Sequence, residues 1–135
     1  MNLTGMTQTK GKIIVVDDDP AMSLALRRFL TASGFRTLTF DSAEDLLDDG
    51  VATTADCLVL DIHLTGLSGL ELRRQLQERG TDPPTVFITG DESLASLSAV
   101  HAPSTPCLRK PFSGQRLLAA IREVLDRVNE ESKRL

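Results

Sequence analysis

Residues that could bind phosphate or a metal ion stand at the ends of short apolar runs. Three aspartates, Asp17, Asp18 and Asp19, follow one such run, and Asp61 follows another. Two further runs lead to a threonine and a lysine, Thr89 and Lys110. Carboxylates, a hydroxyl and an ammonium group form a set that can hold a divalent cation together with a phosphoryl group.

The chemistry that suits this set is phosphoryl transfer to a carboxylate. Clustered carboxylates repel one another, and a divalent cation relieves that repulsion. Oxygen ligands from Asp18 and Asp61, with Asp17 nearby, suit Mg²⁺, which commonly joins carboxylates to phosphate oxygens. Thr89 and Lys110 can then hold the remaining phosphoryl oxygens. Attack by a carboxylate on phosphorus would give an aspartyl phosphate.

The residues that must position this set fall into alternating apolar runs and helical patterns. We predict strands over residues 12–16, 35–40, 57–60, 85–89 and 107–109. We predict helices after Asp19-Pro20, from a capping box of Asp41 and Glu44, over 70–79, weakly over 91–101, and along an apolar stripe from Leu117 to Val128.

This alternation predicts an α/β fold with a parallel sheet covered on both faces. Right-handed crossovers and a doubly wound order gather the carboxyl ends of the strands along one edge, where ligands bind in such sheets. We therefore expect the candidate site residues to meet at that edge: Asp17, Asp18, Asp61, Thr89 and Lys110.

Composition limits the function classes. The chain of 135 residues is the size of one domain, and its net charge of −4 argues against direct binding to nucleic acid. Its apolar runs fall far short of the roughly 20 residues that span a bilayer, so no membrane contact is expected. We expect a flexible leader over residues 1–11, one domain over 12–128, a charged tail over 129–135 that frays, and a cytoplasmic location.

Four motifs occur in a characteristic order: VVDDD at 15–19, LVLDIHLTGLSGLEL at 58–72, FITG at 87–90 and KPF at 110–112. Together they resemble the receiver domain of bacterial two-component response regulators, and the resemblance covers Lys12 to Val128. It implies a flavodoxin-like (βα)5 fold with a five-stranded parallel sheet in the order 2-1-3-4-5.

The resemblance also implies a role for each site residue. Asp61 would be the phosphoacceptor, and Thr89 and Lys110 would contact the phosphoryl group. Asp18 and Asp61 would bind Mg²⁺ directly, Asp17 largely through water, and the backbone carbonyl of His63 would supply another ligand. The bond between Lys110 and Pro111 is typically cis in the family. The side chain of His63 would lie at the rim, where with Asp91 it tunes the lifetime of the phosphoryl group.

The implied partners follow from this chemistry. A histidine kinase or a phosphotransfer protein would donate the phosphoryl group, and a phosphorylation-dependent homodimer or a downstream effector would read the signal. The domain is expected to act as a signalling module with self-catalysed phosphotransfer and dephosphorylation, and not as an enzyme that turns over a separate substrate.

Some positions depart from the family pattern. Thr65 stands where the family usually has proline, four residues after Asp61. Cys107 stands where the family usually has an aromatic switch residue, and Pro103 and Pro106 should shorten the helix before it. Because the fourth strand would separate the third and fifth by roughly 9–10 Å in total, no disulfide between Cys57 and Cys107 is expected.

Three alternatives remain open from the sequence. A phosphatase of the haloacid-dehalogenase type also uses an aspartate nucleophile and Mg²⁺, although His63 replaces its second aspartate. A pseudo-receiver would keep the fold as a non-phosphorylated interaction module. A receiver cut from a longer regulator would carry the same motifs.

Overall fold

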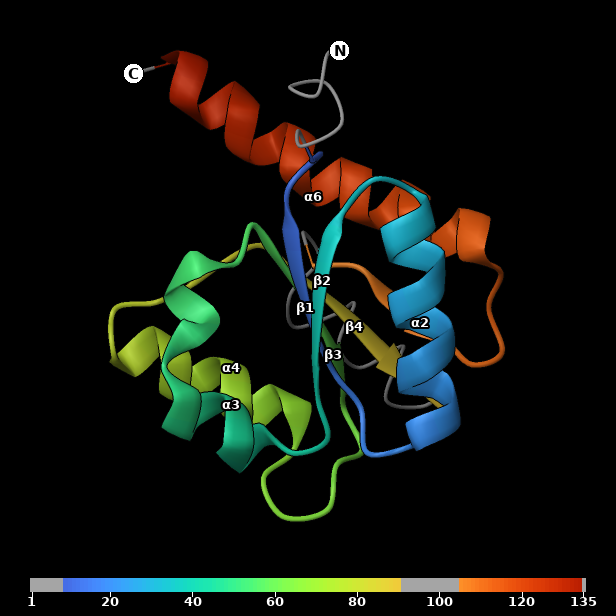
Figure 1. The fold of residues 1–135 in the computed structure, drawn as a ribbon. Helices are drawn as coiled ribbons and strands as arrows, with labels where there is room; N and C mark the ends of the chain where they lie inside the picture. The colour runs from blue at the N-terminus through green and yellow to red at the C-terminus, as the bar shows by residue number, and fades with distance from the viewer. Residues whose placement is uncertain (1–8, 91–104, 135) are drawn as a thin grey trace, which may run out of the picture.

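The fold is a single parallel sheet between two layers of helices (Figure 1). The computed structural model describes residues 9–90 and 105–134. Its strands lie in the order β2-β1-β3-β4-β5 and all pair in parallel. Their bounds are β1 Lys12–Val16, β2 Arg36–Phe40, β3 Cys57–Asp61, β4 Thr85–Thr89 and β5 Cys107–Arg109. The predicted doubly wound order is confirmed.

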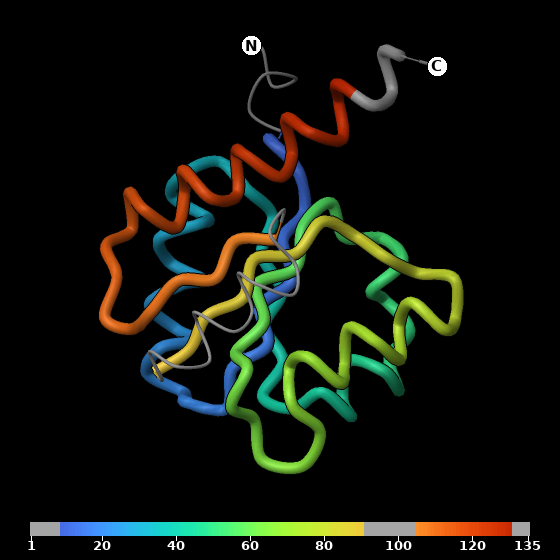
Figure 2. Tube along the Cα trace, turned by 180° about the vertical axis from the view of Figure 1, so that it is seen from behind, coloured from blue at the N-terminus to red at the C-terminus, as the bar shows by residue number. Residues whose placement is uncertain are grey.

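Helices cover both faces of the sheet (Figures 1 and 2). Helices α2 (Pro20–Ala32) and α6 (Gly114–Arg134) lie on one face, and α3 (Ala43–Asp49) and α4 (Gly69–Glu78) lie on the other. Successive strand side chains point to opposite faces, so each strand feeds two cores. Ile13 and Val15 of β1 pack with α2 and α6, whereas Ile14 and Val16 pack with α3 and α4.

Several local predictions need correction. Strand β2 begins at Arg36 because the Phe35 N–H donates to the carbonyl of Leu30 and so closes α2. Helix α3 is capped by Ser42 and not by Asp41, since the Ser42 hydroxyl accepts the Asp45 N–H at 3.0 Å. A short 3-10 helix, η1 (Val51–Thr54), precedes β3 and was not predicted.

Helix α6 continues beyond the predicted end of the domain. The backbone is helical as far as Arg134, and the fraying expected of the tail over residues 129–135 stays a prediction. Glutamate, lysine and arginine in this segment are all good helix formers, which accounts for the continuation. The leader residues 1–8, the weak helix predicted over 91–101, and Pro103 lie outside the described residues.

Neither Cys57 nor Cys107 is part of a disulfide. Cys57 is fully buried under α2 and α6, whereas Cys107 is only partly buried and packs with the core on the opposite face. The expectation that they form no disulfide is confirmed.

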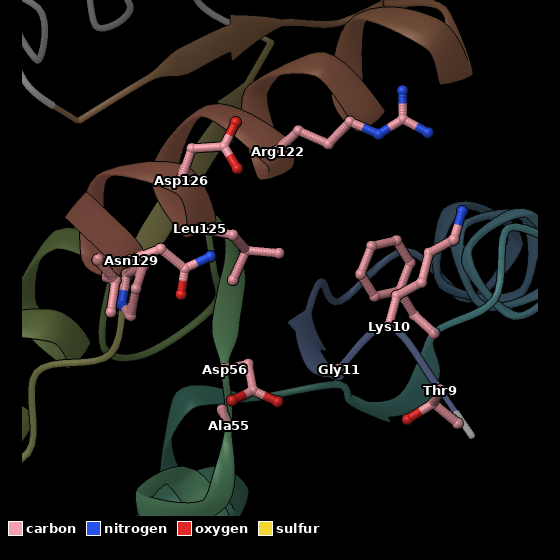
Figure 3. Close-up of a pocket in the computed structure, with 12 residues that line it drawn as sticks. Thr9, Lys10, Gly11, Ala55, Asp56, Arg122, Leu125, Asp126 and Asn129 are labelled. Atoms are coloured by element: carbon pink, nitrogen blue, oxygen red, sulfur yellow. The ribbon is translucent and has the colours of Figure 1, made fainter. Parts of the chain in front are cut away.

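A pocket of about 580 Å³ lies at the amino ends of the strands (Figure 3). Lys10 and Gly11 before β1, Asp56 before β3, and Leu125 and Asp126 of α6 line it. The pocket therefore lies at the opposite end of the sheet from Asp17, Asp18 and Asp61.

Candidate functional site

Three of the predicted site residues converge at the carboxyl edge of the sheet. Asp17 and Asp18 directly follow β1, and Asp61 is the last residue of the neighbouring strand β3. Each offers one carboxylate oxygen, and these oxygens lie within 4.8 Å of one another. Asp17 and Asp61 are buried, while Asp18 is exposed, so the cluster opens to solvent on the Asp18 side.

Lys110 joins this cluster from the far side of β4. Its Nζ donates to Asp61 Oδ2 at 2.9 Å and to Asp17 Oδ2 at 3.1 Å. Its own backbone N–H donates to the Thr89 carbonyl at 2.7 Å. The bond between Lys110 and Pro111 is cis, as the sequence resemblance implied. One ammonium group therefore offsets the charge of two buried carboxylates.

Burial and charge shift two pKa values in the cluster. Burial raises the pKa of the Asp17 carboxyl, and this outweighs the hydrogen bonds that it accepts from Asp19 and Lys110. Burial alone would lower the pKa of Lys110, but its bonds to Asp61 and Asp17 outweigh that and raise the pKa. Lys110 is therefore protonated, and its charge stays in the site at neutral pH.

Thr89 ends β4 and is fully buried. In the pairing of β3 with β4, Asp61 aligns with Ile88, so Thr89 lies one residue further toward the carboxyl edge. Its carbonyl accepts the Lys110 N–H, which fixes the backbone of both residues beside Asp61. The role of its hydroxyl remains a prediction.

His63 lies at the rim of the cluster, as predicted. Its backbone N–H donates to Asp61 Oδ1 at 2.9 Å, and its side chain is exposed. The use of its carbonyl as a metal ligand stays a prediction. Asp91, its suggested counterpart, lies outside the described residues.

Two residues that were not predicted to take part hold the surroundings of the site, one at Asp18 and the other in the loop after β3. Thr65 donates its N–H and its hydroxyl to Asp18 Oδ2, at 3.1 and 3.2 Å. Glu44 of α3 accepts the Leu67 N–H at 3.1 Å and so holds the same loop between β3 and α4. Thr65 could have been suspected from its hydroxyl in a loop that follows the acceptor strand. The contact of Glu44 spans 23 residues and had no signal in the sequence.

The donor set fits Mg²⁺. Three carboxylates on one edge supply hard oxygen ligands, and the exposed side at Asp18 leaves room for the waters that Mg²⁺ usually keeps. With Lys110 added, the same edge could stabilise a phosphoryl group on Asp61.

Comparison with known proteins shows the family to which this chain belongs. Residues 13–122 match the family described as the response regulator receiver domain. The chain belongs to this family. As a receiver it is a signalling domain, and the match argues against the haloacid-dehalogenase alternative.

Curated relatives agree with the family. The transcriptional regulatory protein TdiR of Thauera aromatica is 34% identical over 138 residues, covering 96% of this chain and 60% of TdiR. The response regulator protein TodT of Pseudomonas putida F1 is 34% identical, covering 91% of this chain and 55% of TodT. The receiver chain therefore spans less than two thirds of the length of these relatives.

Solved structures share the fold. Full-length FixJ from B. japonicum superposes with a TM-score of 0.82 at 31% identity, covering 93% of this chain and 63% of FixJ. The response regulator StyR superposes with a TM-score of 0.78 at 36% identity, covering 90% of this chain and 62% of StyR. Within residues 9–90 and 105–134, no helix of the receiver has the length and apolarity needed to cross a membrane.

Proposed function

We propose that this receiver accepts a phosphoryl group on Asp61 in a Mg²⁺-dependent reaction and signals through the resulting change in its loops. One observation carries the proposal: Lys110 Nζ bridges Asp61 and Asp17 at the edge where Asp18 also arrives. A carboxylate that ends a buried strand beside a lysine and two further aspartates has little structural purpose, and it suits phosphoryl transfer.

In the proposed reaction, a carboxylate oxygen of Asp61 attacks the phosphorus of a phosphohistidine. The new O–P bond forms as the P–N bond breaks, and the electron pair leaves with the histidine nitrogen of the donor. Lys110 and the Thr89 hydroxyl would hold the phosphoryl oxygens. Water later attacks the same phosphorus, releases phosphate and restores the Asp61 carboxylate.

The Mg²⁺ ion would be held by Asp17, Asp18, Asp61 and the backbone carbonyl of His63. When bound, the ion would offset negative charge on the phosphoryl oxygens. Asp18 is suited to direct contact because it is the exposed member of the cluster. Asp17 is suited to an outer position because Lys110 and the Asp19 N–H already occupy its two oxygens.

The partners and limits of the domain are part of the same proposal. The donor would be a histidine kinase or a phosphotransfer protein in the cytoplasm, and the readout would be a homodimer or a downstream effector. The receiver unit would extend over residues 12–128. The names of the relatives TdiR and FixJ, both transcriptional regulatory proteins, support an effector that controls transcription.

The direct test is phosphorylation by acetyl phosphate with Mg²⁺, measured by intact mass. The wild-type chain should gain one phosphoryl group that hydroxylamine removes, and Asp61→Asn should gain none. The asparagine variant keeps the shape of the side chain and an acceptor oxygen for Lys110, so its circular dichroism should match the wild type. A wild-type protein that stays unmodified would instead support the pseudo-receiver alternative.

A further inference from the structure

The loop between β3 and α4 is tied to carboxylates in three parts of the fold: the end of β3, the turn after β1, and α3. His63 donates its N–H to Asp61 Oδ1 at 2.9 Å, Thr65 donates to Asp18, and Leu67 donates to Glu44 Oε2 at 3.1 Å. Two of these acceptors belong to the proposed metal site. The path of this loop and the placement of the metal ligands therefore depend on each other.

We propose that Thr65 is a positioning residue that orients Asp18 for Mg²⁺, an inference that rests on the proposed function. Its N–H and its hydroxyl both donate to Asp18 Oδ2, at 3.1 and 3.2 Å. With both donors on Oδ2, the other oxygen, Oδ1, is the one that no described residue binds. An exposed carboxylate that is otherwise free to rotate is thereby held with one oxygen available to a cation.

The residue type matters because the two donors come from different parts of threonine. A proline, which the family usually carries at this position, has neither a backbone N–H nor a hydroxyl and so could make neither bond. Valine keeps the N–H and the branched shape but loses the hydroxyl. Serine keeps both donors. Thr65 thus gives this receiver a hold on Asp18 that the usual proline cannot provide.

The test is a Mg²⁺ titration of the wild type, Thr65→Val and Thr65→Ser. The chain has no tryptophan or tyrosine, so backbone amide NMR shifts are the suitable readout. Removing a group that hydrogen-bonds to a metal ligand typically weakens metal binding about 10–100-fold. At this exposed site we expect Thr65→Val to weaken Mg²⁺ binding about 10-fold. Thr65→Ser should stay within about 2-fold of the wild type, because it retains both donors.

Two controls separate positioning from damage to the fold. Thr31→Val removes an exposed hydroxyl from α2 that bonds to Thr37, away from the aspartates, and should leave Mg²⁺ binding unchanged. At saturating Mg²⁺, Thr65→Val should take up phosphoryl groups at nearly the wild-type rate, because an oriented Asp18 matters less once the ion is bound. A rate that stays low at saturation would overturn the positioning role.

The outcomes also distinguish this inference from the proposed function. If the wild type binds Mg²⁺ and is phosphorylated while Thr65→Val binds equally well or more tightly, the inference about Thr65 fails and the proposed function stands. If the wild type neither binds Mg²⁺ nor accepts a phosphoryl group, the proposed function itself fails.

Discussion

Lys110 places a single positive charge between two carboxylates, one of which is completely buried. Asp17 has no exposed surface, and Asp61 is nearly as enclosed. Removing a partner from such a cluster leaves charge buried without compensation, which costs more than the pair itself gains. The lysine is therefore expected to stabilise the fold as well as to serve the proposed chemistry.

We expect Lys110→Ala to lower the free energy of unfolding by about 2–3 kcal/mol near neutral pH, somewhat less than for a fully buried pair because Lys110 is partly exposed. Burial already raises the pKa of Asp17, and losing the lysine raises it further. Protonation relieves the repulsion, so the deficit should shrink at mildly acidic pH. Urea unfolding at both pH values measures this. The exposed Lys10→Ala is the control, and a deficit that grows on acidification would contradict the argument.

The two thiols should react differently with iodoacetamide. Burial raises the pKa of Cys57 to about 12, with the nearby Asp56 adding to the effect, so almost no thiolate forms at mildly alkaline pH. Cys107 is only partly buried. Peptide mass mapping should find the label on Cys107 in the folded protein and on both residues in urea. Rapid labelling of Cys57 in the folded protein would show that β3 is less enclosed than described.

At the scale of elements, α4 must begin close against the end of β3. A Cβ atom on Gly69 would lie 2.3 Å from the carbonyl oxygen of Asp61, which is backbone and cannot move aside easily. The Gly69 N–H also donates to the Ile62 carbonyl at 3.1 Å. Glycine is therefore required here by contact, at the place where the acceptor strand passes into its loop.

Gly69→Ala should lower the free energy of unfolding by about 1–3 kcal/mol, as overpacking does. It should also slow phosphorylation by acetyl phosphate, because relief of the clash displaces the backbone of Asp61. Thermal unfolding and intact mass measure the two effects. A Cβ on Gly90 meets no atom of the described residues within 4 Å, so Gly90→Ala is the matched control and should change stability by less than about 0.5 kcal/mol.

Elements whose residue pattern follows from burial were predictable from the sequence. Helix ends at which two neighbouring residues could both serve as the cap were not. Strand β1 was predicted to the residue, because a strand buried on both faces gives a continuous apolar run, here the four residues after Lys12. The cap of α3 was wrong because Asp41 and Ser42 are both good caps and only the backbone path selects between them.

In the candidate site, too, some features were predictable from the sequence and others were not. The sequence placed Asp61 and Lys110 at one edge because parallel strands share that edge. It could not place Thr65 on Asp18, since this contact joins residues 47 apart and depends on how an exposed loop turns. Chemistry-bearing residues at strand ends were therefore predictable, and the loop contacts that orient them were not.

At the scale of the whole molecule, Mg²⁺ should stabilise the folded state, because the three aspartates that would bind it come together only when the chain is folded. At ten times the dissociation constant the gain is about 1.4 kcal/mol, which corresponds to a rise of several degrees in melting temperature. Differential scanning calorimetry measures it. Sodium chloride at matched ionic strength controls for screening, and Asp18→Ala should lose most of the gain. An equal rise with sodium chloride would contradict specific binding.

The long helix α6 has a practical consequence. Its last turns and the start of β1 lie at the same side of the molecule, away from the loops that follow β1 and β3 (Figure 1). Asn129 is an exposed residue of α6, and a biotin attached after its substitution would anchor the domain to a sensor chip with the acidic edge facing the flowing solution. Candidate donor kinases could then be passed over one oriented layer and ranked by how fast they dock.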